Sequence, residues 1–205
     1  MKVWSPDELG RFLTEIDGEP HAPMLRLAAL SGLRRGELCG LRWPVLDLDG
    51  DRLTVSRTLL AVHGRLVESE PKTPRSRRIV DLDPATVAIL RDHRRRQLEE
   101  RLAVGSGYMD DGYVFARPDG RPWNPELISR VFDRLAARTG LPRIRLHDLR
   151  HTHTTHLLAA GVNVRIVSQR LGHASVAFTL DIYGHVLPGQ QASAAEAVAA
   201  LVDGS

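Results

Sequence analysis

The sequence predicts an α+β fold that is mainly α-helical and contains one small three-stranded antiparallel sheet. Two patterns lead to this expectation. Apolar residues recur at helical spacing over most of the chain, whereas short runs of Val, Thr, Leu and Ile between turn residues are confined to Arg52–Leu82. The 205 residues include 42% hydrophobic and 26% charged residues and no internal repeat, which is typical of an ordinary globular protein. We therefore expect one domain spanning residues 1–205.

Three helices are expected at the N-terminal end. Ser5 and Glu8 have the spacing of a capping box, and the apolar stripe that follows runs to about Asp17. A second helix, from Pro23 to Leu30, is apolar on most sides and should be buried. A third, short helix should extend from Arg34 to Leu41.

The expected sheet follows these helices. Its strands should be Arg52–Leu60, Arg65–Val67 and Arg77–Leu82, because each run is rich in residues that favour strands and is bounded by turn residues. His63-Gly64 is a plausible hairpin turn.

The remainder of the chain should be almost entirely helical. Asp83 should cap a long, very polar helix, and Tyr113 begins a short extended piece. The expected helices are Ala85–Ala103, Pro125–Arg138, His147–Ala160, Val164–Leu171, Ser175–Ile182 and Gln191–Val202.

The charge distribution favours a polyanionic partner. The formal net charge is +3 and the isoelectric point is near 9.5. Between Arg117 and Arg150 the chain carries eight arginines and four acidic residues. Such a basic surface suits DNA, although a solvated charged surface explains it equally well.

Cysteine use and hydropathy indicate the compartment. Cys39 is the only cysteine, so the chain forms no internal disulfide and fits a reducing environment. We expect Cys39 to be a small buried packing residue. The first residues carry no apolar signal-peptide core, and no run is long enough to span a bilayer. We expect a cytoplasmic protein that does not engage a membrane.

The helix expected from His147 carries the first candidate site. Arg150 should share an outward face with His147, His151 and Thr154, because residues three and four apart are neighbours on a helix. A guanidinium fork matches phosphate oxygens, and a nearby tyrosine such as Tyr183 can attack a phosphate when its proton is removed. The alternatives are a solvated helix face and a half-buried packing tyrosine.

Two further groups fit the same chemistry. Arg34 stands at a helix start, where the dipole favours anions, with Glu37 one turn later. Lys72 lies on a turn among other cations, from which it could protonate a leaving oxygen. A surface ion pair and a solvated basic loop are the alternatives.

Two other patterns in the chain favour different sites. The histidines at 147, 151, 153 and 156 suggest zinc, but no nearby Cys, Asp or Glu completes an evident tetrahedral set, so we expect no metal. Residues 161–173 have the pattern of a helix-turn-helix, which also occurs in DNA-binding proteins without catalysis.

Five short motifs, taken together, resemble the catalytic domain of tyrosine recombinases of the phage-integrase type. They are GLRRGEL at 32–38, PKT at 71–73, HDLRHT at 147–152, LGH at 171–173 and DIY at 181–183. The order and spacing of the motifs fit this family, and the resemblance covers almost the whole chain. The resemblance implies the tyrosine recombinase catalytic-domain fold and the catalytic residues Arg34, Lys72, His147, Arg150, His173 and Tyr183, with Glu37 in support. Contacts to DNA are expected from Arg35, Arg75, Arg77 and Arg145. His151 and His185 receive no firm role.

The resemblance also implies a mechanism. Tyr183 attacks the scissile phosphate and forms a 3′-phosphotyrosine link, Arg34 and Arg150 hold the non-bridging oxygens, and His173 adds a hydrogen bond. Lys72 protonates the leaving 5′-oxygen and His147 helps to move the proton of the tyrosine. The link conserves the bond energy, so no cofactor, ATP or metal is expected.

The implied partners are duplex DNA at a recombination site, further copies of the chain and factors that set direction. We expect a bacterial or phage-encoded protein that is a monomer as this isolated domain and a tetramer on DNA. The family usually carries an N-terminal DNA-clamping domain, which we expect to be absent from this chain, whether it is a fragment or a naturally short member, so DNA binding should be weak. The alternatives are a relaxing topoisomerase, a non-catalytic helix-turn-helix module and an inactive relative.

Overall fold

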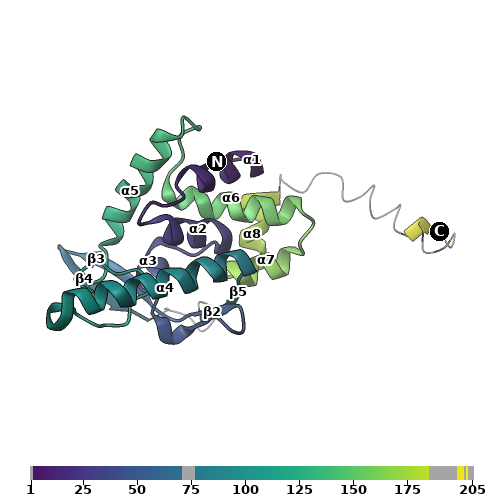
Figure 1. The fold of residues 1–205 in the computed structure, drawn as a ribbon. Coiled ribbons are helices and arrows are strands. Elements are labelled where there is room, and N and C mark those ends of the chain that lie inside the picture. Colours follow the sequence, from purple (N-terminus) through teal and green to yellow (C-terminus); the bar gives the residue numbers. More distant parts are fainter. Residues whose placement is uncertain (1, 71–76, 185–197, 201, 203–205) are drawn as a thin grey trace.

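The computed structural model describes residues 2–70, 77–184, 198–200 and 202 (Figure 1). Its α-helices are α1 (Pro6–Glu15), α2 (Ala22–Ser31), α3 (Arg35–Cys39), α4 (Pro84–Val104), α5 (Pro125–Arg138), α6 (Leu146–Ala159), α7 (Val164–Leu171) and α8 (Val176–Tyr183). Short 3₁₀ turns occur at η1 (Trp43–Val45) and η3 (Gly105–Gly107). The mainly helical α+β fold is confirmed. Most of the helix expected from Gln191 to Val202 lies outside the described residues.

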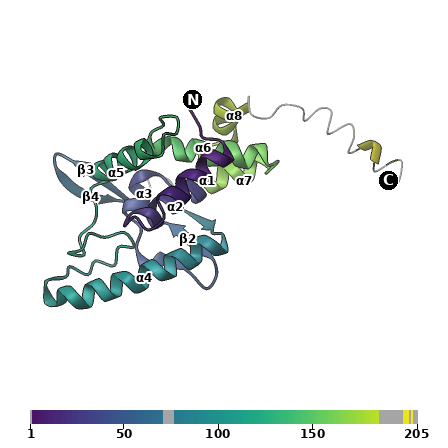
Figure 2. The ribbon, with the colours of Figure 1, turned by 45° about the horizontal axis from the view of Figure 1, so that its top comes forward.

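The N-terminal helices form as their sequences predict. The Ser5 hydroxyl accepts from the Glu8 N–H (3.2 Å), and the Glu8 carboxylate accepts from the Ser5 N–H (2.7 Å), which completes the capping box of α1. The apolar helix α2 is buried and lies between α4 and α6 (Figures 1 and 2). Within the described ranges, no helix is both long and apolar enough to cross a membrane.

The strands assemble differently from the prediction. They are β1 (Leu46–Asp47), β2 (Arg52–Val55), β3 (Thr58–Val62), β4 (Arg65–Ser69) and β5 (Arg78–Asp81). A three-stranded antiparallel sheet is present in the order β1-β2-β5, whereas β3 and β4 form a separate hairpin. The single strand predicted from Arg52 to Leu60 is therefore wrong, because the chain leaves the first sheet after Val55.

The turn between β3 and β4 explains this division. His63 and Gly64 both have positive φ (47° and 76°), the geometry of a two-residue turn whose twist matches an antiparallel pair. It pairs β3 with β4 directly, with Val62 opposite Arg65. The hairpin turn is confirmed. Both edges of β2 are meanwhile occupied by β1 and β5.

The core joins the N-terminal helices to α6, and the C-terminal helices lie beside β5 at the edge of the three-stranded sheet. Trp4, Phe12 and Phe132 pack together, with ring centroids 4.9–5.8 Å apart, and the Trp4 N–H donates to Thr152 of α6 (3.2 Å). α7 and α8 lie at the end of the molecule opposite the β3–β4 hairpin, and α7 contacts β5 (Figures 1 and 2). The end of α7 therefore meets β5, α6 and the start of α3 in one place.

Candidate active site

The candidate site is built around the C-terminal end of α7. Gly172 has a left-handed conformation (φ 65°) that turns the chain out of the helix. The N–H groups of Gly172 and His173 donate back to carbonyls of the preceding turn (3.0 and 3.1 Å). Because a helix leaves its last carbonyls without internal partners, those of Arg170, Leu171 and Gly172 need other donors.

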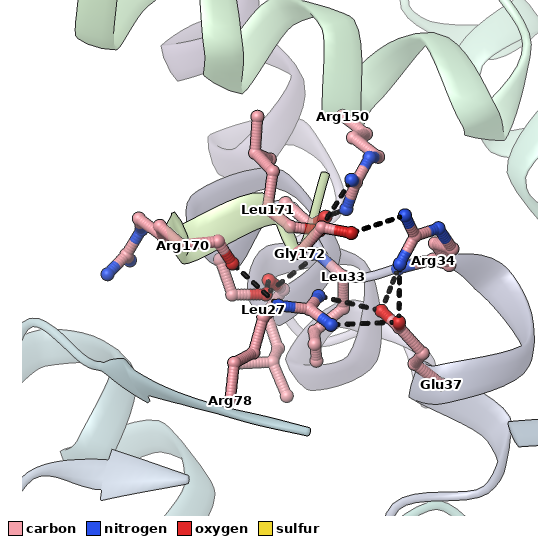
Figure 3. Close-up of polar contacts among 11 residues, drawn as sticks. Leu27, Leu33, Arg34, Glu37, Arg78, Arg150, Arg170, Leu171 and Gly172 are labelled. Atoms are coloured by element: carbon pink, nitrogen blue, oxygen red, sulfur yellow. Dashed lines mark hydrogen bonds and ion pairs between the residues drawn. The ribbon is translucent and has the colours of Figure 1, made fainter. Parts of the chain in front are cut away.

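Three arginines from three different elements supply these donors. They come from β5, from α6 and from the residue that precedes α3 (Figure 3). The pairs are Arg78 Nε with the carbonyl of Arg170 (2.6 Å), Arg150 Nη2 with that of Leu171 (2.7 Å) and Arg34 Nη2 with that of Gly172 (3.1 Å). The partial negative charge of a helix C-terminus stabilises cations placed there. Consecutive backbone carbonyls thus hold three guanidinium groups side by side.

Glu37 links two of these arginines. One carboxylate oxygen accepts from Nη1 of Arg34 and from Nη1 of Arg78 (2.9 Å each), and the other accepts from Arg78 Nη2 (2.9 Å) and from the Arg34 N–H (2.8 Å). Burial alone would raise the pKa of Glu37, but the hydrogen bonds and charges of Arg78 and Arg34 hold it below its ordinary value. The carboxylate is therefore ionised and fixed between two guanidinium groups.

Arg150 does not lie on an outward face, and that prediction is wrong. Its side chain is buried, with 5% of the residue exposed, and it also donates to the carbonyl of Gly32. Thr154, predicted on the same outward face, is fully buried. The reason is that the end of α7 and the Gly32 turn cover this side of α6. Burial, and then the charge of Arg34, lower the pKa of Arg150 to about 9.

Tyr183 lies at the end of α8 with its hydroxyl inside the site. The residue is buried, and its hydroxyl is hydrogen-bonded to Nδ1 of His151. Burial raises the pKa of Tyr183 against the opposing effects of Thr154 and the nearby Arg150 charge. A phenol in this position is protonated until a base removes its proton.

The structure places His151, not His147, against the tyrosine hydroxyl. His147 lies one turn earlier, is exposed, and contacts His151 edge to face with ring centroids 4.9 Å apart. Burial and the charge of His147 lower the pKa of His151. A neutral imidazole with a lone pair on Nδ1 can accept a proton from Tyr183. Spacing gave no sign of this contact, because the two residues are 32 positions apart.

His173 follows Gly172 directly and faces the same cations. Its Nδ1 is hydrogen-bonded to the Thr179 hydroxyl (2.8 Å). Burial, followed by the charges of Arg150 and Arg34, lowers the pKa of His173 to about 4. The ring is therefore neutral near pH 7. It borders a groove of about 470 Å³ that is also lined by Arg77 and Arg165, so the site opens toward a basic surface.

The structure brings together Arg34, Glu37, Arg150, His173 and Tyr183. Of the other predicted site residues, Lys72 and Arg75 lie outside the described residues, as does His185.

The residues predicted to contact DNA are exposed where they are described. Arg35 donates to Ser129 of α5 (2.9 Å), Arg145 pairs with Asp148 (3.0 Å), and Arg77 lines the groove beside His173. These positions leave their role in DNA binding a prediction.

Arg78 is the residue that sequence reasoning missed. It appeared to be one more cation in a basic loop, but it is buried. The alternation of β5 contains the signal, because Arg78 and Val80 point inward while Ile79 and Asp81 point outward.

The remaining histidines and the cysteine have structural positions. His153 is buried and its Nε2 accepts from Arg170 Nε (3.2 Å), whereas His156 is hydrogen-bonded to the Trp4 carbonyl (2.9 Å). Cys39 is fully buried, as predicted, and burial raises the pKa of its thiol to about 12. In the part of the chain that the structure describes, no three His, Cys, Asp or Glu side chains converge as metal ligands.

Comparison with known proteins shows which family the chain resembles. The model of the phage integrase family matches residues 2–190. A tyrosine recombinase XerC-like protein of Caldanaerobacter subterraneus subsp. tengcongensis is 33% identical over 96% of this chain and 53% of its own length. The ICEBs1 integrase of Bacillus subtilis is 31% identical over 96% of this chain and 54% of its own length. The chain therefore spans about half the length of these curated relatives.

A solved structure shows the same fold. The Tn1549 transposon integrase in complex with transposon right end DNA superposes with a TM-score of 0.80 and 26% identity, over 95% of this chain and 64% of that chain.

Proposed function

The chain belongs to the phage integrase family, and on that premise we propose that it breaks and rejoins duplex DNA at a specific site through a 3′-phosphotyrosine link at Tyr183. The observation that carries the proposal is the placement of Arg34 and Arg150 on adjacent carbonyls, with the Tyr183 hydroxyl beside Arg150. A phosphate bound by both guanidinium groups would lie next to a nucleophile. The solved complex of a related integrase with transposon DNA supports duplex DNA as the substrate.

The charge balance of the site supports a phosphodiester substrate. Arg34, Arg78 and Arg150 lie together, and the carboxylate of Glu37 offsets one of their three positive charges. The remaining positive charge favours the phosphodiester anion, and more strongly the additional charge that develops on its oxygens in the transition state. Burial lowers the pKa values of Arg150 and His173 most, and the neighbouring positive charges lower both further.

The positions of the described side chains support the following reaction. The Tyr183 oxygen attacks phosphorus while Nδ1 of His151 takes the phenolic proton. The bond from phosphorus to the 5′-oxygen breaks, and the sequence assigns the proton for that oxygen to Lys72. A 5′-hydroxyl from another strand reverses the step and joins new partners. The covalent link conserves the energy of the phosphodiester, so the exchange needs neither ATP nor a metal.

The same reaction sets the expected assembly. Exchange between two duplexes cuts four strands, and each cut uses one tyrosine, so four copies of the chain should act together on paired sites. The proposal therefore includes a tetramer on DNA, a monomer without it, and accessory factors that set direction. It also places the protein in the cytoplasm of a bacterium, where its DNA substrate lies.

Trapping the covalent intermediate tests the proposal. The protein is mixed with a pool of nicked duplexes of varied sequence in EDTA, and SDS-resistant protein–DNA adducts are measured. Wild-type protein should form adducts, and Tyr183→Phe should form none while still binding DNA. Tyr113→Phe is the matched control, because Tyr113 is also buried with a hydrogen-bonded hydroxyl but bonds to Glu68 far from the site. It should form adducts at the wild-type rate.

The main alternative is a DNA-binding module without catalysis. It draws on the short helices α6, α7 and α8, which are joined by tight turns as in helix-turn-helix proteins. Under that alternative none of the three proteins forms an adduct, and all of them bind DNA equally. Adducts from Tyr183→Phe would instead show that a different residue is the nucleophile.

A further inference from the structure

We propose that Arg78 is a positioning residue for strand cleavage, which holds Arg34 in place beside Arg150 through Glu37 and through the end of α7. The proposal rests on the proposed function and adds a residue that the motifs do not include. Arg78 is buried, and its guanidinium donates to the Arg170 carbonyl and to both oxygens of the Glu37 carboxylate, so its effect on cleavage runs through Arg34.

The contacts of Arg78 fix the orientation of Glu37. Two nitrogens of its guanidinium each donate to a different oxygen of the Glu37 carboxylate (2.9 Å each), which sets both the position and the plane of that carboxylate. Glu37 in turn accepts from the side chain and from the backbone N–H of Arg34. The orientation of Arg34 therefore depends on a carboxylate that Arg78 holds.

Arg78 also holds the second anchor of Arg34. Nε of Arg78 donates to the carbonyl of Arg170, two residues before the Gly172 carbonyl that accepts from Arg34. The contacts form a closed ring that runs from Arg78 through Glu37, Arg34 and the end of α7 back to Arg78 (Figure 3). Arg34 has two supports, the Glu37 carboxylate and the Gly172 carbonyl. Removing Arg78 loosens both of them, whereas removing either support alone leaves the other in place.

The position of Arg78 in the chain gives the ring a further consequence. Arg78 is the first residue of β5 and pairs with Val55 of β2. Lys72, the expected proton donor, precedes it by six positions in the sequence. Strand β5, which follows the Lys72 segment in the sequence, is thus linked through Arg78 to the Glu37 carboxylate that holds the phosphate-binding Arg34.

The test compares Arg78→Lys with a matched control. Lysine keeps the charge but not the planar fork, so it cannot hold both oxygens of Glu37 and the Arg170 carbonyl together. Arg91→Lys is the control, because Arg91 also donates to a backbone carbonyl and to a carboxylate, those of Leu48 and Asp49, but lies away from the site.

Three readouts separate positioning from folding. The first is the adduct rate at saturating protein, together with the protein concentration at half-saturation. The second is the ratio of rates for the two phosphorothioate diastereomers at the scissile phosphate, which reports how the non-bridging oxygens are held. The third is the NMR signal of the Arg34 Nε–H group, identified by its loss in Arg34→Lys, which needs no reaction.

Arg78→Lys should lower the adduct rate about 100-fold, the loss that a displacement of about 1 Å produces in a positioned site. The protein concentration at half-saturation should stay within twofold of the wild-type value. The ratio of rates for the two diastereomers should change, and the Arg34 NMR signal should shift. Arg91→Lys should match wild type in all three readouts. The double variant Glu37→Met/Arg78→Met removes both buried charges and should fold, but it should cleave as poorly as Arg78→Lys.

Three results would overturn the proposal. One is a wild-type rate and ratio for Arg78→Lys, and another is a double variant that cleaves like wild type, because Arg78 would then only neutralise Glu37. The third is an Arg34 signal that does not move. A wild-type protein that forms no adduct overturns the proposed function. The Arg34 signal then tests the positioning role by itself, because a shift in Arg78→Lys supports that role and an unmoved signal overturns it.

Discussion

Replacing Glu37 with glutamine should destabilise the fold by about 3–5 kcal/mol, because it leaves the buried guanidinium of Arg78 without its carboxylate. For a domain of this size each kcal/mol lowers Tm by about 2–4 °C, so Tm should fall by roughly 6–20 °C. Glu99→Gln is the matched control. Glu99 pairs with Arg95 on the surface, where about 60% of each side chain is exposed, and its replacement should change stability by less than about 0.5 kcal/mol.

Thermal and urea unfolding at pH 7 measure the difference, and a second experiment at lower pH tests its cause. The pKa of Glu37 is lowered in the fold, so its stabilisation is complete above the unfolded pKa near 4.5 and is lost as pH falls through the folded value. Wild-type protein should therefore lose more stability below pH 4.5 than Glu37→Gln does. A Glu37→Gln protein that melts within 2 °C of wild type at pH 7 would refute the reasoning.

Three further predictions concern single positions. His151→Gln should lower the adduct rate by about 100-fold with DNA affinity unchanged, since it removes the proton acceptor of Tyr183. In wild-type protein the adduct rate should fall as pH drops through the His151 pKa, which burial holds below 6.5. An adduct rate that does not change at acid pH would contradict this role. Gly172→Ala should cost about 1–2 kcal/mol in urea unfolding, because φ is +65° and the new Cβ would lie 3.0 Å from Arg78 Nη1; unchanged stability would show that the turn adapts. The Cys39 thiol should not react with a disulfide reagent at pH 8 until the protein is unfolded, and rapid labelling of native protein would show that it is accessible.

The helices and turns could be predicted because their signals are local. The capping box of α1 and the His63-Gly64 turn depend on residues within a few positions of one another, and both formed as expected. The partners of the strands could not be predicted. A two-residue strand such as β1 carries almost no pattern, and which edge of β2 is free depends on tertiary contacts.

The site was predicted as a set of residues but not as an arrangement. The motifs named Arg34, Arg150, His173 and Tyr183, which the structure places together. Periodicity placed Arg150 outside, because an arginine on a helix is usually exposed. Its burial depends on carbonyls contributed by residues distant in sequence, at Gly32 and Leu171, which a helical pattern does not reveal.

Backbone carbonyl oxygens accept the hydrogen bonds of the three arginines, and this affects which changes in the α7 sequence the site tolerates. Backbone carbonyls are the same whatever side chains α7 carries, so substitutions at its exposed positions Arg165, Ile166 and Gln169 can accumulate without changing the spacing of the three guanidinium groups. Insertion or deletion of a single residue in α7 is different, because it rotates everything beyond it by roughly 100°. Among descendants of this sequence, the exposed positions of α7 should therefore vary in composition while the length of the helix stays constant.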